Sequence, residues 1–215
     1  MQPALQAPDN RGIAVRWEVA DDDKFTRMTR SGQSLALPGL AYSAHAEVQG
    51  LAPDRHYFYR FMTGDTVSAV GRPRTFLAPN AAVAGLRLAY ASCQRWEHGY
   101  YSAYRHMAQE NLDLVMFLGD YIYEYPRAAN SVRTPPGGWV LSLDDYRQRY
   151  ATHKQDADLQ DLHAACPWLV TWDDHEVQND YAGLTVGENG PEVPDFAARR
   201  SPAYQAFYEH MPVRT

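Results

Sequence analysis

Apolar and polar residues alternate in several short stretches of the first third of the chain, most clearly from Ile13 to Val19. A period of two residues predicts half-buried β-strands. On this pattern the expected strands are 13–19, 25–30, 44–48, 57–61 and 67–76, with turns at 21–23, 31–32 and 63–65. Short strands separated by regularly spaced turns favour an antiparallel β-sandwich.

The pattern changes after residues 77–85, LAPNAAVAG, which we interpret as a linker because the segment is rich in small residues and has no clear period. Beyond it, three apolar runs predict buried strands, and the segments between and after them predict helices. The expected strands are 86–92, 113–119 and 167–171, and the expected helices lie within 93–112 and at 143–154, 156–165 and 195–210. Ser142 is the expected cap of the second helix. Alternating strands and helices predict an α/β fold.

The segment GLAPDRHYFYRF narrows the fold of the first region. Leu51, Pro53 and Tyr57 stand where a fibronectin type III sandwich carries its corner tyrosine, so residues 1–79 resemble a fibronectin-like or Ig-like domain. Such domains have about 100 residues, and we therefore expect the first strand to be missing. A second domain of α/β type is expected at residues 80–215.

Reactive side chains follow each of the three apolar runs. Cys93 follows the first run, Asp120 and Tyr123 follow the second, and the third leads into the sequence WDDHE at residues 172–176. In open parallel sheets the ligand crevice lies outside the carboxyl ends of the strands. The sequence therefore predicts that these side chains meet at one edge of the sheet, and we interpret this edge as a metal site.

Each residue type suits this chemistry, and each also has an ordinary structural explanation. The carboxylate of Asp120 can bridge two cations, as two-metal phosphoryl-transfer sites require, but an Asp after a glycine can equally cap a turn. Cys93 can bind as a thiolate and Tyr123 as a phenolate suited to trivalent iron, although single Cys and Tyr residues are more often packing residues. Asp174 offers a hard oxygen ligand, and His175 can bind metal, donate a proton or hold a phosphoryl oxygen. The coincidence at three strand ends favours the metal site.

Composition and charge exclude other classes of protein. The chain has 215 residues with a formal net charge of -6 and no long basic run, which argues against a nucleic-acid groove. No stretch approaches the roughly 18 consecutive apolar residues of a membrane span. The N-terminal sequence MQPALQAPDNRG has no visible export signal, and two cysteines are too few for a disulfide scaffold.

Three motifs carry a resemblance to a known family. SCQ at residues 92–94, GDYIYE at 119–124 and WDDHEVQND at 172–180, with these separations, resemble the PhoD-type alkaline phosphatase family within the calcineurin-like metallophosphoesterases. The leader ending in GRPRTF resembles that family's N-terminal domain, so the similarity extends over essentially the whole chain. Because the family's catalytic domain continues well past residue 215, the resemblance is to its N-terminal portion, with the first half of the α/β metallophosphatase domain.

The resemblance implies an Fe(III) ion with Cys93, Asp120 and Tyr123 among its ligands and Ca(II) as the neighbouring ion. Asp120 would bridge the metals, and Asp174 would bind the second one. His175 would contact the phosphate or protonate the leaving alkoxide, and the implied supporting residues are Asp173 and Asn179. A zinc or manganese pair stays open as an alternative, because spacing does not settle metal identity.

The resemblance also implies an activity: hydrolysis of phosphate esters by a metal-activated hydroxide that attacks phosphorus in line. The expected substrates are small phosphomonoesters and phosphodiesters, with nucleic acid at most as a diester substrate. Full-length members are expected to be periplasmic or secreted, after twin-arginine export. The alternative, from a different class, is a noncatalytic fragment whose fibronectin-like domain acts as an interaction module.

Overall fold

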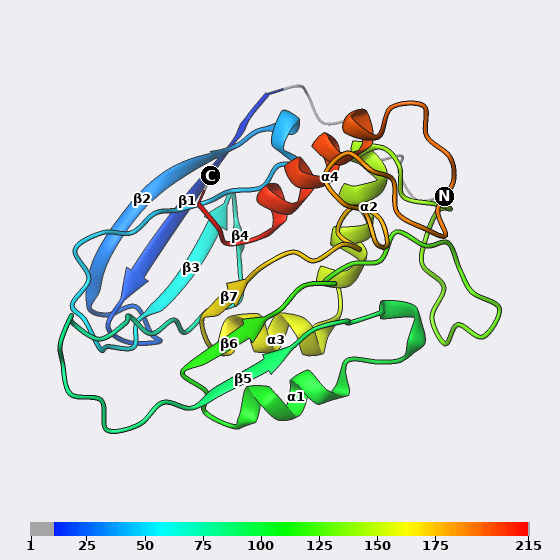
Figure 1. Ribbon diagram of the computed structural model, residues 1–215. Helices are drawn as coiled ribbons and strands as arrows, with labels where there is room; N and C mark the ends of the chain where they lie inside the picture. The colour runs from blue at the N-terminus through cyan, green and yellow to red at the C-terminus, as the bar shows by residue number, and fades with distance from the viewer. Residues whose placement is uncertain (1–10, 215) are drawn as a thin grey trace.

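Residues 11–214 are described by a computed structural model, in which they form two β-sheets of different type (Figure 1). The first sheet is antiparallel with the strand order β2-β1-β3-β4, and the second is parallel with the order β5-β6-β7. The antiparallel strands are β1 (Ile13–Ala20), β2 (Met28–Ala36), β3 (Phe58–Thr63) and β4 (Thr66–Val67). The parallel strands are β5 (Leu88–Ala91), β6 (Leu114–Phe117) and β7 (Trp168–Val170). The prediction about an export signal concerns residues 1–10, which lie outside the described residues.

Strand β2 corrects the prediction of a strand at 25–30 followed by a turn at 31–32, because it runs without interruption through Gly32. Gly32 pairs with Trp17 of β1, and a Cβ on Gly32 would lie 2.3 Å from the Trp17 ring. The glycine therefore makes room for the indole and does not mark a turn. The turn between β1 and β2 lies at residues 21–23, as predicted, and the Asp22 carboxylate accepts three backbone N–H hydrogen bonds there.

Two other predicted strands are also corrected. Residues 44–48 are not a strand: the segment is tied to β2 by side chains, as when the hydroxyl of Ser34 donates to the carbonyl of His45 at 2.7 Å. Of the strand predicted at 67–76, only β4 forms. After β4, isolated bridges pair Gly71 with Tyr59 and Arg74 with His56. Pro73 lies in that stretch, and its missing N–H cannot donate to a ladder.

The first region is antiparallel as predicted, but within residues 11–214 it contains one sheet and not the two of a sandwich. The corner tyrosine has the expected geometry. Tyr57 is 2% exposed, and its hydroxyl accepts a hydrogen bond from the N–H of Ala52 at 2.9 Å. The chain direction at this corner is therefore fixed by one buried side chain.

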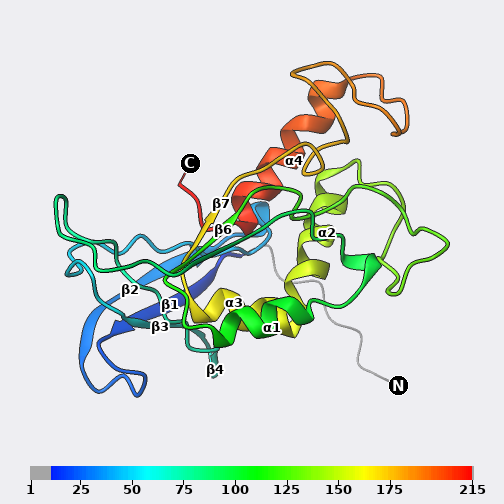
Figure 2. The same cartoon turned by 60° about the horizontal axis from the view of Figure 1, so that its bottom comes forward.

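Helices α1 (Ser102–Gln109) and α3 (Ala157–Ala165) pack side by side against one face of the parallel sheet (Figure 2). The helix predicted within 93–112 is shorter than expected, because a 3₁₀ turn, η2 (Trp96–His98), precedes α1. Helices α2 (Leu143–Lys154) and α4 (Phe196–His210) confirm the remaining helix predictions, and a second 3₁₀ turn, η1 (Pro38–Leu40), follows β2. No helix in the described part of the chain is long and apolar enough to cross a membrane.

The two faces of the parallel sheet differ in burial. Val115 and Phe117 of β6 are 0% and 1% exposed, as expected for a buried strand. The prediction of a buried strand is wrong for β5, where Leu88 and Tyr90 are 47% and 73% exposed. Successive side chains of a strand point to opposite faces of the sheet. The side chains of Leu88 and Tyr90 therefore lie on the face opposite the helices and are exposed to solvent.

Side-chain caps fix where the helices begin. Ser142 accepts a hydrogen bond from the N–H of Asp145, and the Asp145 carboxylate accepts one from the N–H of Ser142, which confirms the predicted cap of α2. The carboxylates of Asp156 and Asp195 cap α3 and α4 by accepting backbone N–H hydrogen bonds from the first turn of each helix. Such caps stabilise a helix by about 1 kcal/mol each.

Arginine side chains join the two sheet regions. Arg74, in the segment after β4, forms ion pairs with Asp54 and with Asp113, which precedes β6. Arg147 on α2 donates to the carboxylate of Glu209 and also to the carbonyl of Gly39 at 2.7 Å. These contacts hold the antiparallel sheet against the α/β region.

Gly119 joins the end of β6 to the loop that carries Asp120. Its φ is +102°, and a Cβ would lie 2.5 Å from the Cβ and 2.6 Å from the N of Asp173. Its carbonyl accepts a hydrogen bond from the N–H of Cys93 at 3.2 Å. The absence of a side chain at residue 119 therefore lets the ends of all three parallel strands approach one another.

Glu176 ties the loop after β6 to the loop after β7. Its side chain is buried, and its carboxylate accepts hydrogen bonds from three backbone N–H groups. The donors are Tyr121 at 2.6 Å, Asp120 at 3.1 Å and Asp173 at 2.8 Å.

The substitution Gly119→Ala should lower the free energy of unfolding by about 2–4 kcal/mol, because alanine meets both an unfavourable φ and a steric clash with Asp173. Urea denaturation measures the change. The control is Gly85→Ala, at a position where nothing lies within 4 Å of the added Cβ, and it should change stability by less than about 0.5 kcal/mol. Equal stability of the two variants would contradict the assigned role of Gly119.

The substitution Glu176→Ala should destabilise the fold by about 3 kcal/mol or more, because it leaves three N–H groups without their acceptor. The matched control is Glu188→Ala in an exposed loop, for which little change is expected. Urea denaturation of both variants decides, and a loss below about 1 kcal/mol for Glu176→Ala would show that water replaces the carboxylate without cost.

Candidate metal centre

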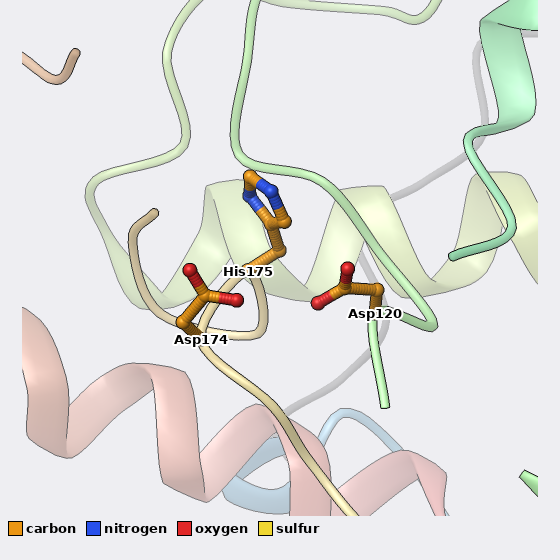
Figure 3. Close-up of side chains that lie close together, drawn as sticks. All are labelled: Asp120, Asp174 and His175. Atoms are coloured by element: carbon orange, nitrogen blue, oxygen red, sulfur yellow. The ribbon is translucent and has the colours of Figure 1, made fainter. Parts of the chain in front are cut away.

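Asp120, Asp174 and His175 converge at the carboxyl edge of the parallel sheet (Figure 3). Asp120 follows β6 and the other two follow β7, and one ligand atom from each lies within 4.8 Å of the other two. The two carboxylates face each other, with the imidazole beside them. Three of the residues predicted as ligands or catalytic groups are therefore brought together.

The Asp120 carboxylate has one oxygen in use and one without a partner. Oδ2 accepts hydrogen bonds from the hydroxyl of Tyr123 at 3.0 Å and from the thiol of Cys93 at 3.3 Å. Oδ1 is buried and has no hydrogen-bond partner within residues 11–214. An unpaired carboxylate oxygen is costly to bury, and a bound cation removes that cost. The residues present therefore fit a cation next to Asp120.

Cys93 and Tyr123 complete this part of the centre. Both donate to the same oxygen of Asp120, so the structure places these two predicted ligands beside it. Burial raises the pKa of the Tyr123 phenol, and the neighbouring Asp120 charge raises it further. In the apo form the phenol is therefore a hydrogen-bond donor, and a cation would have to displace its proton to bind it.

Glu124 holds His175 and was missed by the sequence analysis. Its side chain is 0% exposed, Oε2 lies 2.8 Å from Nδ1 of His175, and Oε1 accepts a hydrogen bond from the N–H of Asn179 at 2.8 Å. The sequence signal that could have identified Glu124 is its position at the end of the GDYIYE motif, directly after three apolar or aromatic residues. Glu124 leaves Nε2 as the nitrogen of His175 that is free to act.

The environment of His175 favours its protonated form. Burial lowers the pKa, but the hydrogen bond that Nδ1 donates to Glu124 and the charges of Glu124, Asp120 and Asp174 outweigh burial, so that the pKa is raised above its ordinary 6.5. The rings of Tyr123 and Tyr125 lie 4.2 Å and 5.3 Å from the imidazole. The imidazole is thus held between a carboxylate and two aromatic rings.

Two further buried polar residues were missed. Burial raises the pKa of Glu176 to about 7, although three N–H groups bind its carboxylate. Gln94 accepts hydrogen bonds from the hydroxyls of Tyr101 and Tyr104, and its amide donates to the carbonyl of Tyr121 at 2.9 Å. Gln94 lies in the SCQ motif beside Cys93, so the motif itself was the available signal.

The predicted supporting residues contribute mainly through their backbones. The N–H of Asp173 donates to Glu176, while its side chain is exposed, and burial and the charges of Asp120 and Asp174 raise its pKa. Asn179 donates its N–H to Glu124. Neither side chain belongs to the cluster formed by Asp120, Asp174 and His175.

The loop at 126–140 borders the candidate centre through Trp139 and Tyr125. Arg149 of α2, which is 1% exposed, donates to the carbonyls of Tyr123, Tyr125 and Gly138. The ring of Trp139 lies 5.3 Å from that of Tyr125. The buried guanidinium of Arg149 therefore binds the chain at both ends of this loop, at Tyr125 and at Gly138.

Comparison with known proteins agrees with this geometry. Residues 2–77 match the N-terminal domain of PhoD-like phosphatases, and residues 88–215 match the PhoD-like phosphatase family itself. The chain is 50% identical over 209 residues to alkaline phosphatase D of Bacillus subtilis (strain 168), which is 95% of this chain and 36% of that protein. A solved structure of PhoD, also 50% identical, superposes with a TM-score of 0.91 over 96% of this chain and 40% of that one.

The chain thus spans less than half the length of these two relatives. The family matches cover both sheet regions and all three motifs. This chain belongs to the PhoD-like phosphatase family.

Proposed function

We propose that this chain carries part of the catalytic centre of a metal-dependent hydrolase of phosphate esters, an alkaline phosphatase and phosphodiesterase, acting together with the further residues that the longer relatives have. The observation that carries the proposal is the meeting of Asp120, Asp174 and His175 around a buried carboxylate oxygen that has no partner within the described residues. The same convergence favours a hydrolase over the alternative of a noncatalytic interaction module, which needs no such cluster.

The donor set supports iron and calcium as the cations. Cys93, Asp120 and Tyr123 would hold Fe(III), since a thiolate and a phenolate together suit that ion, and Asp174 would hold Ca(II) through a hard carboxylate oxygen. A zinc or manganese pair is the alternative. The chemistry such cations supply is Lewis-acid activation of water and neutralisation of the charge on phosphoryl oxygens.

The chain's own residues have three tasks in this proposal. His175 lies beside the two carboxylates, and its Nε2, which Glu124 does not engage, can donate a proton to the leaving alkoxide or hold a phosphoryl oxygen. Glu124 orients the imidazole through Nδ1, and its burial excludes water from that hydrogen bond. Asp173 and Asn179 support the loop, through backbone hydrogen bonds to Glu176 and Glu124.

The organisation of the full protein is part of the proposal. We infer a fibronectin-like domain at 1–79, supported by the corner geometry of Tyr57, and a catalytic region at 80–215. The proposed substrates are small phosphate esters, and the proposed location, periplasmic or secreted, rests on the family alone.

A visible absorption spectrum of the chain loaded with Fe(III) tests the iron site. A tyrosinate bound to Fe(III) should give a charge-transfer band that Tyr123→Phe abolishes, because that variant lacks the phenolate. The matched control is Tyr125→Phe, which removes a nearby hydroxyl and should keep the band. Elemental analysis reports the iron content of each sample. A band that survives in Tyr123→Phe would contradict the assignment. Well-folded protein that takes up no iron would show either that ligands from the longer relatives are needed or that the ion is not iron.

The pKa of His175 in the metal-free chain tests its pairing with Glu124. An NMR titration of the imidazole should give a pKa above 6.5, and Glu124→Gln should lower it, because the variant removes both the charge and the charged acceptor. The stability that this pair adds should be complete below pH 6.5 and be lost as pH rises through the folded-state pKa. Glu188→Gln is the control, and an identical His175 pKa in both variants would refute the pairing.

A further inference from the structure

Arg95 lies next to the candidate metal centre, two residues after Cys93. Its guanidinium carbon is 4.8 Å from the ring centroid of Tyr125 and 5.4 Å from that of Tyr123. These are the two rings that also contact His175. The guanidinium and the imidazole therefore share one aromatic support.

One edge of the guanidinium is fixed by the protein. Nε donates to Oε1 of Glu97 at 2.6 Å, and the Glu97 side chain is 1% exposed. The backbone N–H of Arg95 donates to the carbonyl of Cys93 at 3.0 Å. Because the side chain is already held, little conformational entropy is lost when its free edge binds a ligand.

The other edge of the guanidinium is open. The Arg95 side chain is 23% exposed, and its two Nη groups donate no hydrogen bond to any residue within 11–214. Arg149 differs, since both of its Nη groups donate to backbone carbonyls. Arg95 and Cys93 line the same hollow of about 390 Å³, through which a small solute can reach them.

We propose that Arg95 binds the phosphoryl group of the substrate through its two Nη groups, beside His175. The inference rests on the proposed function of the centre as a phosphate-ester hydrolase. The carboxylates of Asp120, Asp173 and Asp174 repel a phosphate dianion, and a cation beside them offsets that repulsion. A planar guanidinium also donates two parallel hydrogen bonds to two phosphoryl oxygens, which a point charge does not.

Isothermal titration calorimetry with inorganic phosphate tests the proposal on the chain loaded with Fe(III) and Ca(II). Arg95→Gln should weaken phosphate binding roughly ten- to a hundredfold, the range expected for lost hydrogen bonds to a charged group. Arg95→Lys keeps the positive charge but loses the paired Nη donors of the guanidinium. Its affinity for phosphate should lie between that of the parent chain and that of Arg95→Gln. The control Arg105→Gln removes a surface guanidinium on α1 and should bind phosphate as the parent does. Iron content and the visible band of Tyr123 should stay unchanged in all variants.

The outcomes separate this inference from the proposed function. Equal phosphate affinity in the parent, Arg95→Gln and Arg95→Lys overturns the inference and leaves the metal centre in place. Parallel loss of iron and phosphate also overturns it, because Arg95 would then act on the metal ligands. Arg95→Lys keeps a cation beside Glu97. If its thermal melt matches that of the parent chain, weaker phosphate binding by this variant is not caused by unfolding. A parent chain that takes up both metals but binds no phosphate contradicts the proposed function, and this inference with it.

Discussion

A single buried carboxylate, that of Glu176, holds together two loops that lie 55 residues apart in the sequence. Each loop leaves backbone N–H groups pointing into the interior, and such groups must find an acceptor when water is excluded. Glu176 supplies that acceptor for both loops at once. The relative positions of Asp120 and Asp174 therefore depend on a residue that contacts neither of their carboxylates.

The surroundings of the centre concentrate negative charge in a place with little water. Glu97, Glu124 and Glu176 are all at most 1% exposed. Each is compensated by a different partner: a guanidinium, an imidazole and a set of backbone N–H groups. Asp120 and Glu97 each keep one buried carboxylate oxygen without a hydrogen-bond partner within residues 11–214. Asp120 differs from Glu97 because Asp174 and His175 lie beside it, so a cation at that place would have further ligands.

Sequence analysis placed the candidate ligands at one edge of the sheet because strand topology is readable from local patterns. Cys93, Asp120 and His175 follow apolar runs, and a parallel sheet brings the ends of such runs to one edge. Glu124 and Glu176 were not predicted, because their partners lie more than 50 residues away and no local period encodes them.

The fold predictions failed where tertiary contacts override local pattern. Gly32 faces an indole from the next strand instead of marking a turn, and residues 44–48 alternate like a strand but are held by side chains. The exposure of Leu88 and Tyr90 in β5 was missed because an apolar run predicts a strand that is buried on both faces, whereas in β5 only one face is covered. For Gly32 and for residues 44–48, the deciding contact comes from a neighbouring strand.

The backbone at two proposed ligands carries one further consequence. Cys93 and Asp120 have φ angles of +56° and +57°, in the left-handed region that β-branched residues avoid and that Asn, Asp, His and Gly tolerate. Redesign of this centre for another metal is therefore limited by conformation before it is limited by ligand chemistry. Asparagine and histidine fit the existing loops, whereas threonine or valine would have to reshape them.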